Sequence, residues 1–238
     1  MEEMYEEYPG KVNYQIVEEH GKGAYGKVYL VVYHNFDSSK YVDDFYAIKQ
    51  ISLNGFSDEK IKKIKNEANF LSNIKSDYIV RYIDSFENKD NNTFNIVMEY
   101  CQNSDLRKFI NNHKKEGKLI NEDVIYSIIW DLCLGIREIH QNNLIHRDLK
   151  PENIFIGRDF KIKIGDLGIS KQLSEDTLFA STFTGTLNYM APEIFKGDKY
   201  TNKVEMWSLG CIIYELFSLN VCFPQTNLVD LVGKITGG

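Results

Sequence analysis

The spacing of apolar residues changes near Met98. Before this residue, short runs of β-branched and aromatic side chains alternate with polar stretches, which is typical of strands joined by turns. The predicted strands lie at residues 16–17, 28–33, 45–50, 79–83 and 94–98. One helix interrupts them, because Ser57 can cap it and apolar residues recur at helical spacing from there to about residue 74. A small antiparallel sheet with one helix laid across it is expected.

After Met98 the apolar spacing is helical. Asn121 is typical of a helix cap, and the wide apolar face that follows it predicts a buried helix. A second helix is predicted after Thr201, with Trp207 and Leu216 inside it. A long irregular stretch, residues 170–191, lies between the two helices. Loops longer than about 12–15 residues are usually functional or disordered.

These patterns predict an α+β fold with two lobes. The expected division is an acidic N-terminal tail over residues 1–13, a small antiparallel β lobe with one helix over residues 14–98, and a mainly helical large lobe over residues 99–238. The connection near residues 99–101 is expected to act as a hinge. Clefts between lobes are common sites for ligands.

Charge and composition argue against nucleic-acid binding, membrane insertion and secretion. The net charge of −6 argues against nucleic acid, because proteins that bind duplexes usually carry a basic face. No apolar run approaches the roughly 20 residues that span a bilayer. The acidic and aromatic residues 1–8 lack the basic and apolar regions of a secretory signal. An intracellular protein without membrane insertion is expected, with the cytoplasm as the favoured compartment.

Four cysteines occur without CxxC spacing, each among apolar residues: Cys101, Cys133, Cys211 and Cys222. In an intracellular protein this distribution favours reduced thiols that pack as small core residues.

Residues 21–28 have the pattern GxGxxGxV, with glycines at Gly21, Gly23 and Gly26. Alone, this pattern fits an ordinary turn or a dinucleotide-binding fold, in which the third glycine opens a helix. Here Gly26 leads into residues 27–33, which have strand chemistry and no helix cap. We therefore favour a strand–turn–strand hairpin. Such a hairpin can lie over nucleotide phosphates, because glycine lets backbone N–H groups approach closely.

Lys49 ends an apolar strand pattern. A lysine in such a strand either extends its amine to water or pairs with a carboxylate, since an unpaired buried charge is costly. Glu67 is the candidate partner, because it flanks the apolar face of the predicted helix. A Lys49–Glu67 pair would aim the ammonium group at phosphate oxygens.

Residues 146–153 read His-Arg-Asp-Leu-Lys-Pro-Glu-Asn and follow the predicted buried helix. A predicted strand at residues 162–164 then leads to Asp-Leu-Gly at residues 166–168. Asp148, Asn153 and Asp166 are oxygen donors in neighbouring loops, which suits Mg²⁺ bound together with substrate phosphates. Each residue alone fits a turn former or a cap, but the joint spacing does not.

These motifs occur in one order along the chain, followed by Ala-Pro-Glu at residues 191–193. In that combination the chain resembles the eukaryotic protein kinases from about Tyr14 to its last residue. The resemblance implies a bilobal fold and transfer of the γ-phosphate of ATP, with Mg²⁺, to hydroxyl groups of protein substrates. It also implies that the helical lobe is C-terminally truncated, because kinase large lobes normally continue for several more helices.

The resemblance assigns roles to the motif residues. Asp148 would accept the proton of the substrate hydroxyl, and Asn153 and Asp166 would bind Mg²⁺. Lys49 would contact the α- and β-phosphates and be held by Glu67. The residues implied to surround the nucleotide are Gly21, Gly23, Gly26, Val28, Ala47, Lys49, Met98, Glu99, Cys101, Asp105 and Phe155.

Among these residues, Met98 would be the gatekeeper next to the adenine. Glu99 and Cys101 would offer backbone groups to the base, and Asp105 would reach the ribose.

Lys150 lies two residues after Asp148, where a lysine accompanies serine/threonine specificity in the kinases that this chain resembles. Thr186 matches the threonine that these enzymes place against the lysine and the base. Residues 179–186 and 97–101 are similar to the NIMA-related (Nek) kinases, although residues 151–152 and 187–188 differ from that pattern. Thr182 matches the usual phosphorylation site, and its phosphate would pair with Arg147 to order the loop.

Two departures from the family pattern favour a second hypothesis, a kinase-like module that binds ATP or a partner without catalysis. Glu205 stands where the family usually has an aspartate that binds the backbone of the catalytic loop, so the loop is expected to be held less well. Glu193 would lack its arginine partner, which lies beyond the end of this chain in the family. A small-molecule phosphotransferase is disfavoured, because residues 166–193 resemble a platform for a protein substrate.

Overall fold

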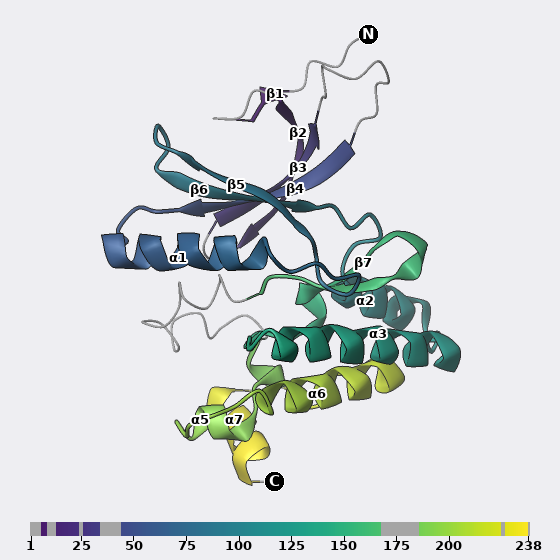
Figure 1. Ribbon diagram of the computed structural model, residues 1–238. Helices are drawn as coiled ribbons and strands as arrows, with labels where there is room; N and C mark the ends of the chain where they lie inside the picture. The colour runs from purple at the N-terminus through teal and green to yellow at the C-terminus, as the bar shows by residue number, and fades with distance from the viewer. Residues whose placement is uncertain are drawn as a thin grey trace. The chain divides into compact units, whose positions relative to one another are not determined.

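A computed structural model describes residues 6–8, 13–23, 26–33, 44–167, 186–224 and 227–237 of the chain. The chain divides into two compact units. The first comprises residues 1–75 and 81–100, and the second comprises residues 76–80 and 101–238. The first unit contains a sheet and one helix, whereas the second is mainly helical (Figure 1). The predicted α+β kinase fold is confirmed.

The first unit is built on a six-stranded sheet with the order β1-β2-β3-β4-β6-β5, in which all neighbours are antiparallel. The strands are β1 (Glu6–Glu7), β2 (Tyr14–Gly23), β3 (Gly26–Tyr33), β4 (Asp44–Ser52), β5 (Tyr82–Asn88) and β6 (Thr93–Glu99). Val31, Ile48 and Val97 are fully buried in one cluster on the central strands. Burial of β-branched residues from three neighbouring strands fixes the register, because a slip of one residue would turn each side chain to the opposite face.

One strand of the first unit lies at a different position from the sequence prediction. The strand expected at residues 79–83 begins only at Tyr82, because Ile79 and Val80 belong to the second unit. There the Val80 N–H donates to the Ile164 carbonyl at 2.9 Å. The residue pattern predicts extended backbone at this position, but it does not tell which sheet the backbone joins.

Helix α1 (Asp58–Leu71) is the single helix described in the first unit. The Ser57 hydroxyl accepts a hydrogen bond from the Lys60 N–H at 3.3 Å, so the predicted cap is confirmed. Ile64 and Ala68, one helical turn apart, are fully buried. The helix ends at Leu71, about one turn before the predicted end.

The second unit contains five α-helices in its described part. They are α2 (Leu106–Glu116), α3 (Glu122–Gln141), α5 (Pro192–Phe195), α6 (Val204–Ser218) and α7 (Leu228–Gly237). The short elements are 3₁₀ turns η1 (Pro151–Asn153), η2 (Arg158–Phe160) and η3 (Thr186–Tyr189) and the antiparallel strands β7 (Ile154–Ile156) and β8 (Ile162–Ile164). Helices α3 and α6 pack side by side (Figure 1).

The predicted N-terminal cap is confirmed for α3 and is wrong for α6. Asn121 accepts a hydrogen bond from the Asp123 N–H at 2.8 Å and caps α3 as predicted. Thr201 does not cap α6; Lys203 holds that position without a side-chain hydrogen bond. A turn intervenes, in which the Val204 N–H donates to the Thr201 carbonyl at 3.3 Å.

The four cysteines are free thiols, and their burial differs. Cys101 and Cys211 are buried and Cys222 is half-buried, but Cys133 is exposed. The prediction of a core position is therefore wrong for Cys133. Its neighbour Leu132 takes the buried position on α3, and the next residue along a helix points about 100° away.

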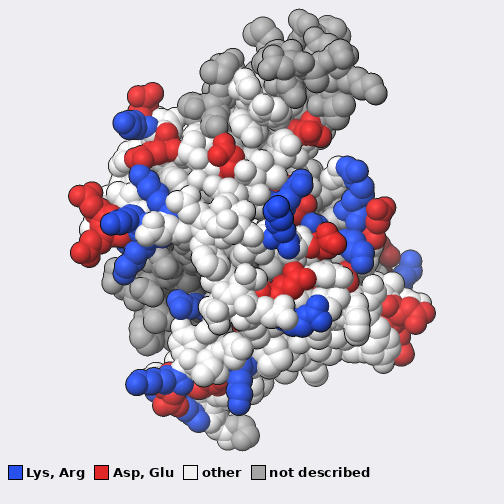
Figure 2. Space-filling model, in the orientation of Figure 1, with Lys and Arg blue, Asp and Glu red and all other residues white. Residues whose placement is uncertain are grey.

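Charges on the described surface are mixed. On the face shown in Figure 2, basic and acidic side chains are interspersed. Some form exposed ion pairs, such as Lys65 with Glu87 at 2.5 Å. No helix in the described part of the chain is both long and apolar enough to cross a membrane.

Candidate active site

The predicted catalytic segment lies between α3 and β7, and His146 anchors it. The His146 side chain is buried, and its Nδ1 atom accepts a hydrogen bond from the Asp148 N–H at 3.2 Å. Because a backbone N–H can only donate, the remaining ring proton of neutral His146 sits on Nε2. That atom donates to the Gly165 carbonyl at 2.7 Å. One histidine thus connects the turn around Asp148 to the residue before Asp166.

Two neighbouring side chains orient the carboxylate of Asp148. The Lys150 Nζ atom lies 2.9 Å from Oδ2, and the Asn153 Nδ2 atom donates to the same oxygen at 3.0 Å. Asn153 also donates to the Asp148 backbone carbonyl at 2.8 Å. The side chains of Asp148 and Lys150 are 21% and 17% exposed, so an incoming hydroxyl group can still reach the carboxylate.

The antiparallel pair β7–β8 brings Asn153 and Asp166 together. Ile154 is paired with Ile164, and the Gly165 N–H donates to the Asn153 carbonyl at 2.9 Å. Asp166 follows directly and adopts a left-handed backbone with φ of 57°. Since Nδ2 of Asn153 donates to Asp148, the amide oxygen is the atom that can serve a cation. One amide oxygen and one carboxylate at the end of this hairpin fit Mg²⁺.

No cluster of three or more His, Cys, Asp or Glu residues suited to a metal is found among the described residues. At phosphoryl-transfer sites Mg²⁺ is bound by one or two carboxylates together with substrate phosphates and water, and Asn153 and Asp166 are the residues that would hold it here.

Glu205, in the first turn of α6, holds the backbone of the catalytic segment. Its side chain is 1% exposed. Oε1 accepts hydrogen bonds from the backbone N–H groups of His146 and Arg147, the latter at 3.3 Å. Oε2 contacts Nε2 of His140. The expectation that glutamate would hold this loop less well is contradicted, because the longer side chain reaches both amides and engages a histidine as well.

Arg107 on α2 links four segments around the catalytic loop. Its Nε donates to Glu152 at 2.8 Å, and its two terminal nitrogens contact Glu215 on α6. One of these nitrogens also contacts the hydroxyl of Tyr189, which in turn donates to Glu215. Burial alone would lower the pKa of Arg107, but the hydrogen bonds with Glu215 and the other partners raise it well above its usual value. The sequence analysis missed this network.

The Glu215 side chain is only 3% exposed, so its charge depends on Arg107. A buried carboxylate is tolerated when charged hydrogen bonds satisfy it, and it destabilises strongly when its partner is removed. Burial is also the main cause that raises the pKa of Tyr189, with the neighbouring charge of Glu215 as a further cause. Tyr189 therefore stays a neutral donor at all ordinary pH values.

A small pocket in the second unit is lined by Asp148, by Tyr189 and Met190 from the segment before α5, and by Ser208 from α6. Its interior volume is about 10 Å³, which is room for a single water molecule.

The glycine-rich segment forms the predicted hairpin in the first unit. Gly23 of β2 is paired with Gly26 of β3, and residues 24–25 between them lie outside the described residues. Because Gly26 opens a strand and not a helix, the dinucleotide fold is excluded. Gly26 is also required by packing, since a Cβ atom there would lie 1.7 Å from the Gln50 carbonyl oxygen. Gly21 is exposed and has open space around it.

The sheet register aligns the other nucleotide-site candidates of the first unit. Val28 of β3 is opposite Lys49 of β4, and Ala47 is opposite Met98 of β6. Lys49 is half-buried. The backbone of Glu67 lies in α1, but its side chain falls outside the described part, so the Lys49–Glu67 pair stays a prediction.

The remaining candidates lie around the connection between the units. Glu99 ends β6, and its Oε1 accepts from the Arg81 N–H at 2.6 Å. Cys101 begins the continuous part of the second unit. Asp105 caps α2 by accepting from the Lys108 N–H at 2.8 Å, and its backbone bridges to Phe155. Contact of these residues with one nucleotide stays a prediction.

Comparison with known proteins agrees with this arrangement. The model of the family described as protein kinase domain matches residues 14–235. Serine/threonine-protein kinase Nek1 from Mus musculus is 38% identical over 220 residues, which cover 92% of this chain and 17% of that protein. Serine/threonine-protein kinase Nek2 from Homo sapiens is 33% identical over 231 residues, which cover 95% of this chain and 51% of that protein. This chain belongs to the protein kinase domain family. The predicted resemblance, including its Nek character, is confirmed.

The kinase domain spans a sixth to a half of the length of these curated relatives. Serine/threonine-protein kinase Nek5 from Homo sapiens is 36% identical over 223 residues, which cover 93% of this chain and 30% of that protein. The named activity of each relative belongs to a longer protein.

The predicted switch of the kinase domain falls largely outside the described residues. Thr182 lies there, and of Thr186 only the backbone is described, as the first residue of η3. Arg147 is half-buried with a left-handed backbone, φ of 67°. Glu193 lies in α5. The roles of Thr182, Thr186 and Arg147 in regulation remain predictions.

Proposed function

We propose that this chain is the catalytic domain of an ATP- and Mg²⁺-dependent kinase that phosphorylates serine and threonine hydroxyls of proteins. The observation that carries the proposal is the arrangement of Lys150 and Asn153 on one oxygen of Asp148. A carboxylate fixed in this way presents its other oxygen in a defined direction. General-base catalysis requires such placement within hydrogen-bond reach of the proton that is removed.

In the proposed reaction the substrate hydroxyl oxygen bonds to the γ-phosphorus of ATP while the bond from that phosphorus to the β,γ-bridging oxygen breaks and ADP leaves. Asp148 accepts the proton of the hydroxyl. The ammonium group of Lys150, 2.9 Å from Asp148, supplies positive charge beside the path of the transferred group. Asn153 and Asp166 would hold Mg²⁺, which would neutralise charge on the phosphates. Phosphoryl transfer depends mainly on alignment of the reactants and neutralisation of charge, and these few groups supply both functions.

The first unit is proposed to bind the nucleotide. The hairpin with Gly21, Gly23 and Gly26 would cover the phosphates, and Lys49 would contact them from the adjacent strand. Ala47 of β4 lies opposite Met98 of β6, and Val28 of β3 lies opposite Lys49, two residues along β4 from Ala47. Three apolar residues on neighbouring strands suit the walls of an adenine site. Glu99 and Cys101 would contribute backbone groups to the base.

Serine and threonine are favoured over tyrosine as acceptors because Lys150 lies beside the base. The inactive alternative loses one of its two supports, since Glu205 holds the catalytic segment through two backbone amides and His140. A loop held in this way is suited to catalysis, where small displacements of a base are costly.

The test is transfer of labelled γ-phosphate from ATP, with Mg²⁺, to a generic protein substrate, followed by identification of the phosphorylated amino acids. Label on serine and threonine is expected, and none without Mg²⁺. Label mainly on tyrosine would overturn the specificity. Absence of transfer, combined with a melting temperature raised by Mg-ATP, would support a nucleotide-binding module instead.

A further inference from the structure

Tyr8 is almost completely buried, although it ends a strongly acidic segment near the start of the chain. Its exposed fraction is 1%. The two residues before it form β1, with Glu6 paired to Ile16 and Glu7 paired to Gln15 of β2. The Tyr8 N–H continues this pattern by donating to the Tyr14 carbonyl at 2.6 Å. Residues 6–8 therefore cover the edge of β2 that would otherwise present free backbone groups.

The hydroxyl of Tyr8 reaches two polar side chains of the sheet. It donates to Oδ1 of Asn95 at 2.9 Å and accepts from Nε2 of Gln50 at 3.1 Å. Asn95 is fully buried, and its own amide nitrogen donates to the Thr93 hydroxyl at 3.3 Å. A buried amide and a buried phenol would each be costly if left without partners, so Asn95 and Tyr8 depend on one another.

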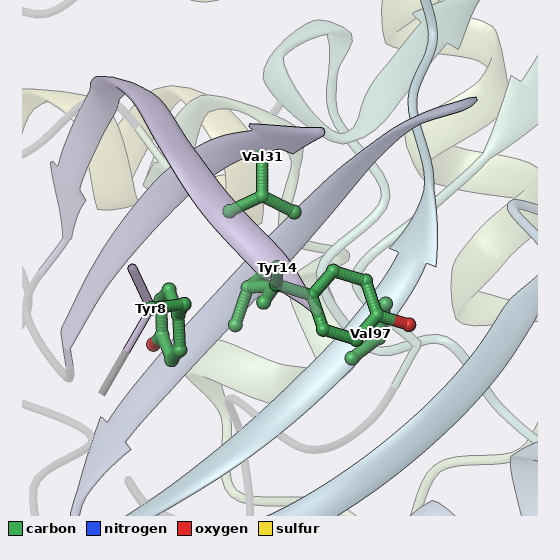
Figure 3. Close-up of a cluster of buried hydrophobic side chains, with 5 residues drawn as sticks. Tyr8, Tyr14, Val31 and Val97 are labelled. Atoms are coloured by element: carbon green, nitrogen blue, oxygen red, sulfur yellow. The ribbon is translucent and has the colours of Figure 1, made fainter. Parts of the chain in front are cut away.

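Two aromatic rings enclose Tyr8 from the sides. Tyr29 of β3 lies at 5.5 Å and Phe86 of β5 at 5.9 Å between ring centroids, both with edge-to-face geometry. Figure 3 shows Tyr8 on the sheet together with Tyr14, Val31 and Val97. Strands β3, β4, β5 and β6 thus each give one wall residue to Tyr8. We name Tyr29, Gln50, Phe86 and Asn95 the aromatic docking site.

We propose that this face of the sheet is a docking site for an extended segment that carries a tyrosine, and that residues 6–8 are its occupant in this chain. The occupant combines two recognition modes: strand addition along β2 and insertion of an aromatic side chain. The proposal is independent of phosphoryl transfer. It adds an interaction surface to the first unit, on the strand whose far end carries Gly21 and Gly23.

The chemistry of the site excludes a negative charge at the hydroxyl position. The Tyr8 oxygen is enclosed by two amides and two rings, and burial raises the pKa of Tyr8 far above its usual value. A phosphate adds about two negative charges and three acceptor oxygens, which need more donors than the single amide of Gln50 that faces the hydroxyl. A phosphorylated tyrosine would therefore leave the site.

The first experiment compares Tyr8→Phe, Tyr8→Ala and Tyr8→Glu in the full chain. Melting temperatures are expected to fall in that order, with a loss of roughly 5–10 °C for alanine and more for glutamate. Hydrogen exchange at the amide of residue 8 should accelerate at least tenfold in the alanine and glutamate variants. Tyr214→Ala, at a tyrosine that is 49% exposed, is the matched control and should melt like the parent chain.

The second experiment adds the peptide of residues 1–9 in excess to the Tyr8→Glu chain, whose own segment no longer fits. The peptide is expected to restore most of the lost melting temperature, and the same peptide with a phosphate on Tyr8 is expected to restore none. Equal rescue by both peptides, or rescue by neither, would overturn the docking site. A Tyr8→Ala chain with unchanged melting and exchange would overturn the role of residues 6–8 as its occupant.

Discussion

The two units position their candidate functional residues by different means. In the first unit, the backbone ladder places Val28 opposite Lys49 and Ala47 opposite Met98. In the second unit, side chains from helices hold the catalytic loop, chiefly Glu205 on α6 and Arg107 on α2. A ladder distributes position over many equivalent bonds, whereas a loop depends on a few. Single substitutions should therefore affect catalysis more in the second unit than in the first.

Among the side chains that hold the catalytic loop, Glu205 is expected to give the largest effect on activity. Replacement by alanine removes the acceptor for two backbone amides and leaves His140 without its buried partner. The catalytic rate constant should fall by about a hundredfold or more, because the base is displaced. Glu205→Asp, which keeps the charge, should retain most of the activity. Equal activity of the alanine variant and the parent chain in a phosphate-transfer assay would break the contrast between the units.

Arg107→Ala should give the largest loss of stability. It leaves the buried carboxylate of Glu215 without its cation, and breaking a buried pair in this way costs about 3–5 kcal/mol. Denaturant unfolding measures the change. The adjacent Lys108→Ala is the matched control, since the Lys108 side chain is 60% exposed and such pairs contribute about 0–1 kcal/mol. Similar losses for both variants would show that the network is not what stabilises the loop.

In the first unit, Gly26→Ala should be more damaging than Gly21→Ala. A Cβ atom at Gly26 would lie 1.7 Å from the Gln50 carbonyl oxygen. A Cβ atom at Gly21 would have no contact within 4 Å. The strands must separate locally, and overpacking of this kind costs about 1–3 kcal/mol. Thermal unfolding of the two variants provides the comparison. An alanine at Gly26 that is tolerated as well as one at Gly21 would contradict the close approach of β3 and β4.

The smallest expected effect is measured without any substitution. The reactivity of the native thiols reports on the packing of α6, the helix that carries Glu205 and Glu215. Burial raises the pKa of Cys211 to about 12, so at pH 8 its thiolate is about a thousandfold scarcer than that of an ordinary cysteine. Cys133 is exposed on α3 and should react with a small alkylating reagent first. Mass spectrometry of the modified chain measures the order. Cys211 reacting as fast as Cys133 would mean that α6 is not part of a stable core.

The sequence predicts most of what depends on local pattern. Helix caps at Ser57 and Asn121 and the hairpin between Gly23 and Gly26 follow from residue chemistry and spacing. The candidate catalytic residues could be named because their motif occupies consecutive positions. Neighbourhood along the chain is sufficient for these features, since their hydrogen bonds join residues a few positions apart.

The remaining features depend on partners that are distant in sequence. Arg107 contacts Glu215 across 108 positions, and Glu205 contacts the His146 amide across 59. The edge strand with Tyr8 was expected to be part of an acidic tail, because nothing near it indicates that Asn95 lies within reach. Ile79 has the composition of a strand but bridges to Ile164 instead of joining the sheet of the first unit. In each instance tertiary contacts decide between arrangements that the local pattern leaves equal.

The most direct test of the account is the Asp148→Asn variant, which keeps the size of the side chain and removes its charge. Single-turnover transfer from labelled Mg-ATP to a protein substrate would be measured beside the stability of the chain and its binding of Mg-ATP. We predict that transfer falls by about 10²–10⁴-fold while nucleotide binding and melting temperature change little. Transfer at the rate of the parent chain would contradict the assignment of Asp148 as the catalytic base.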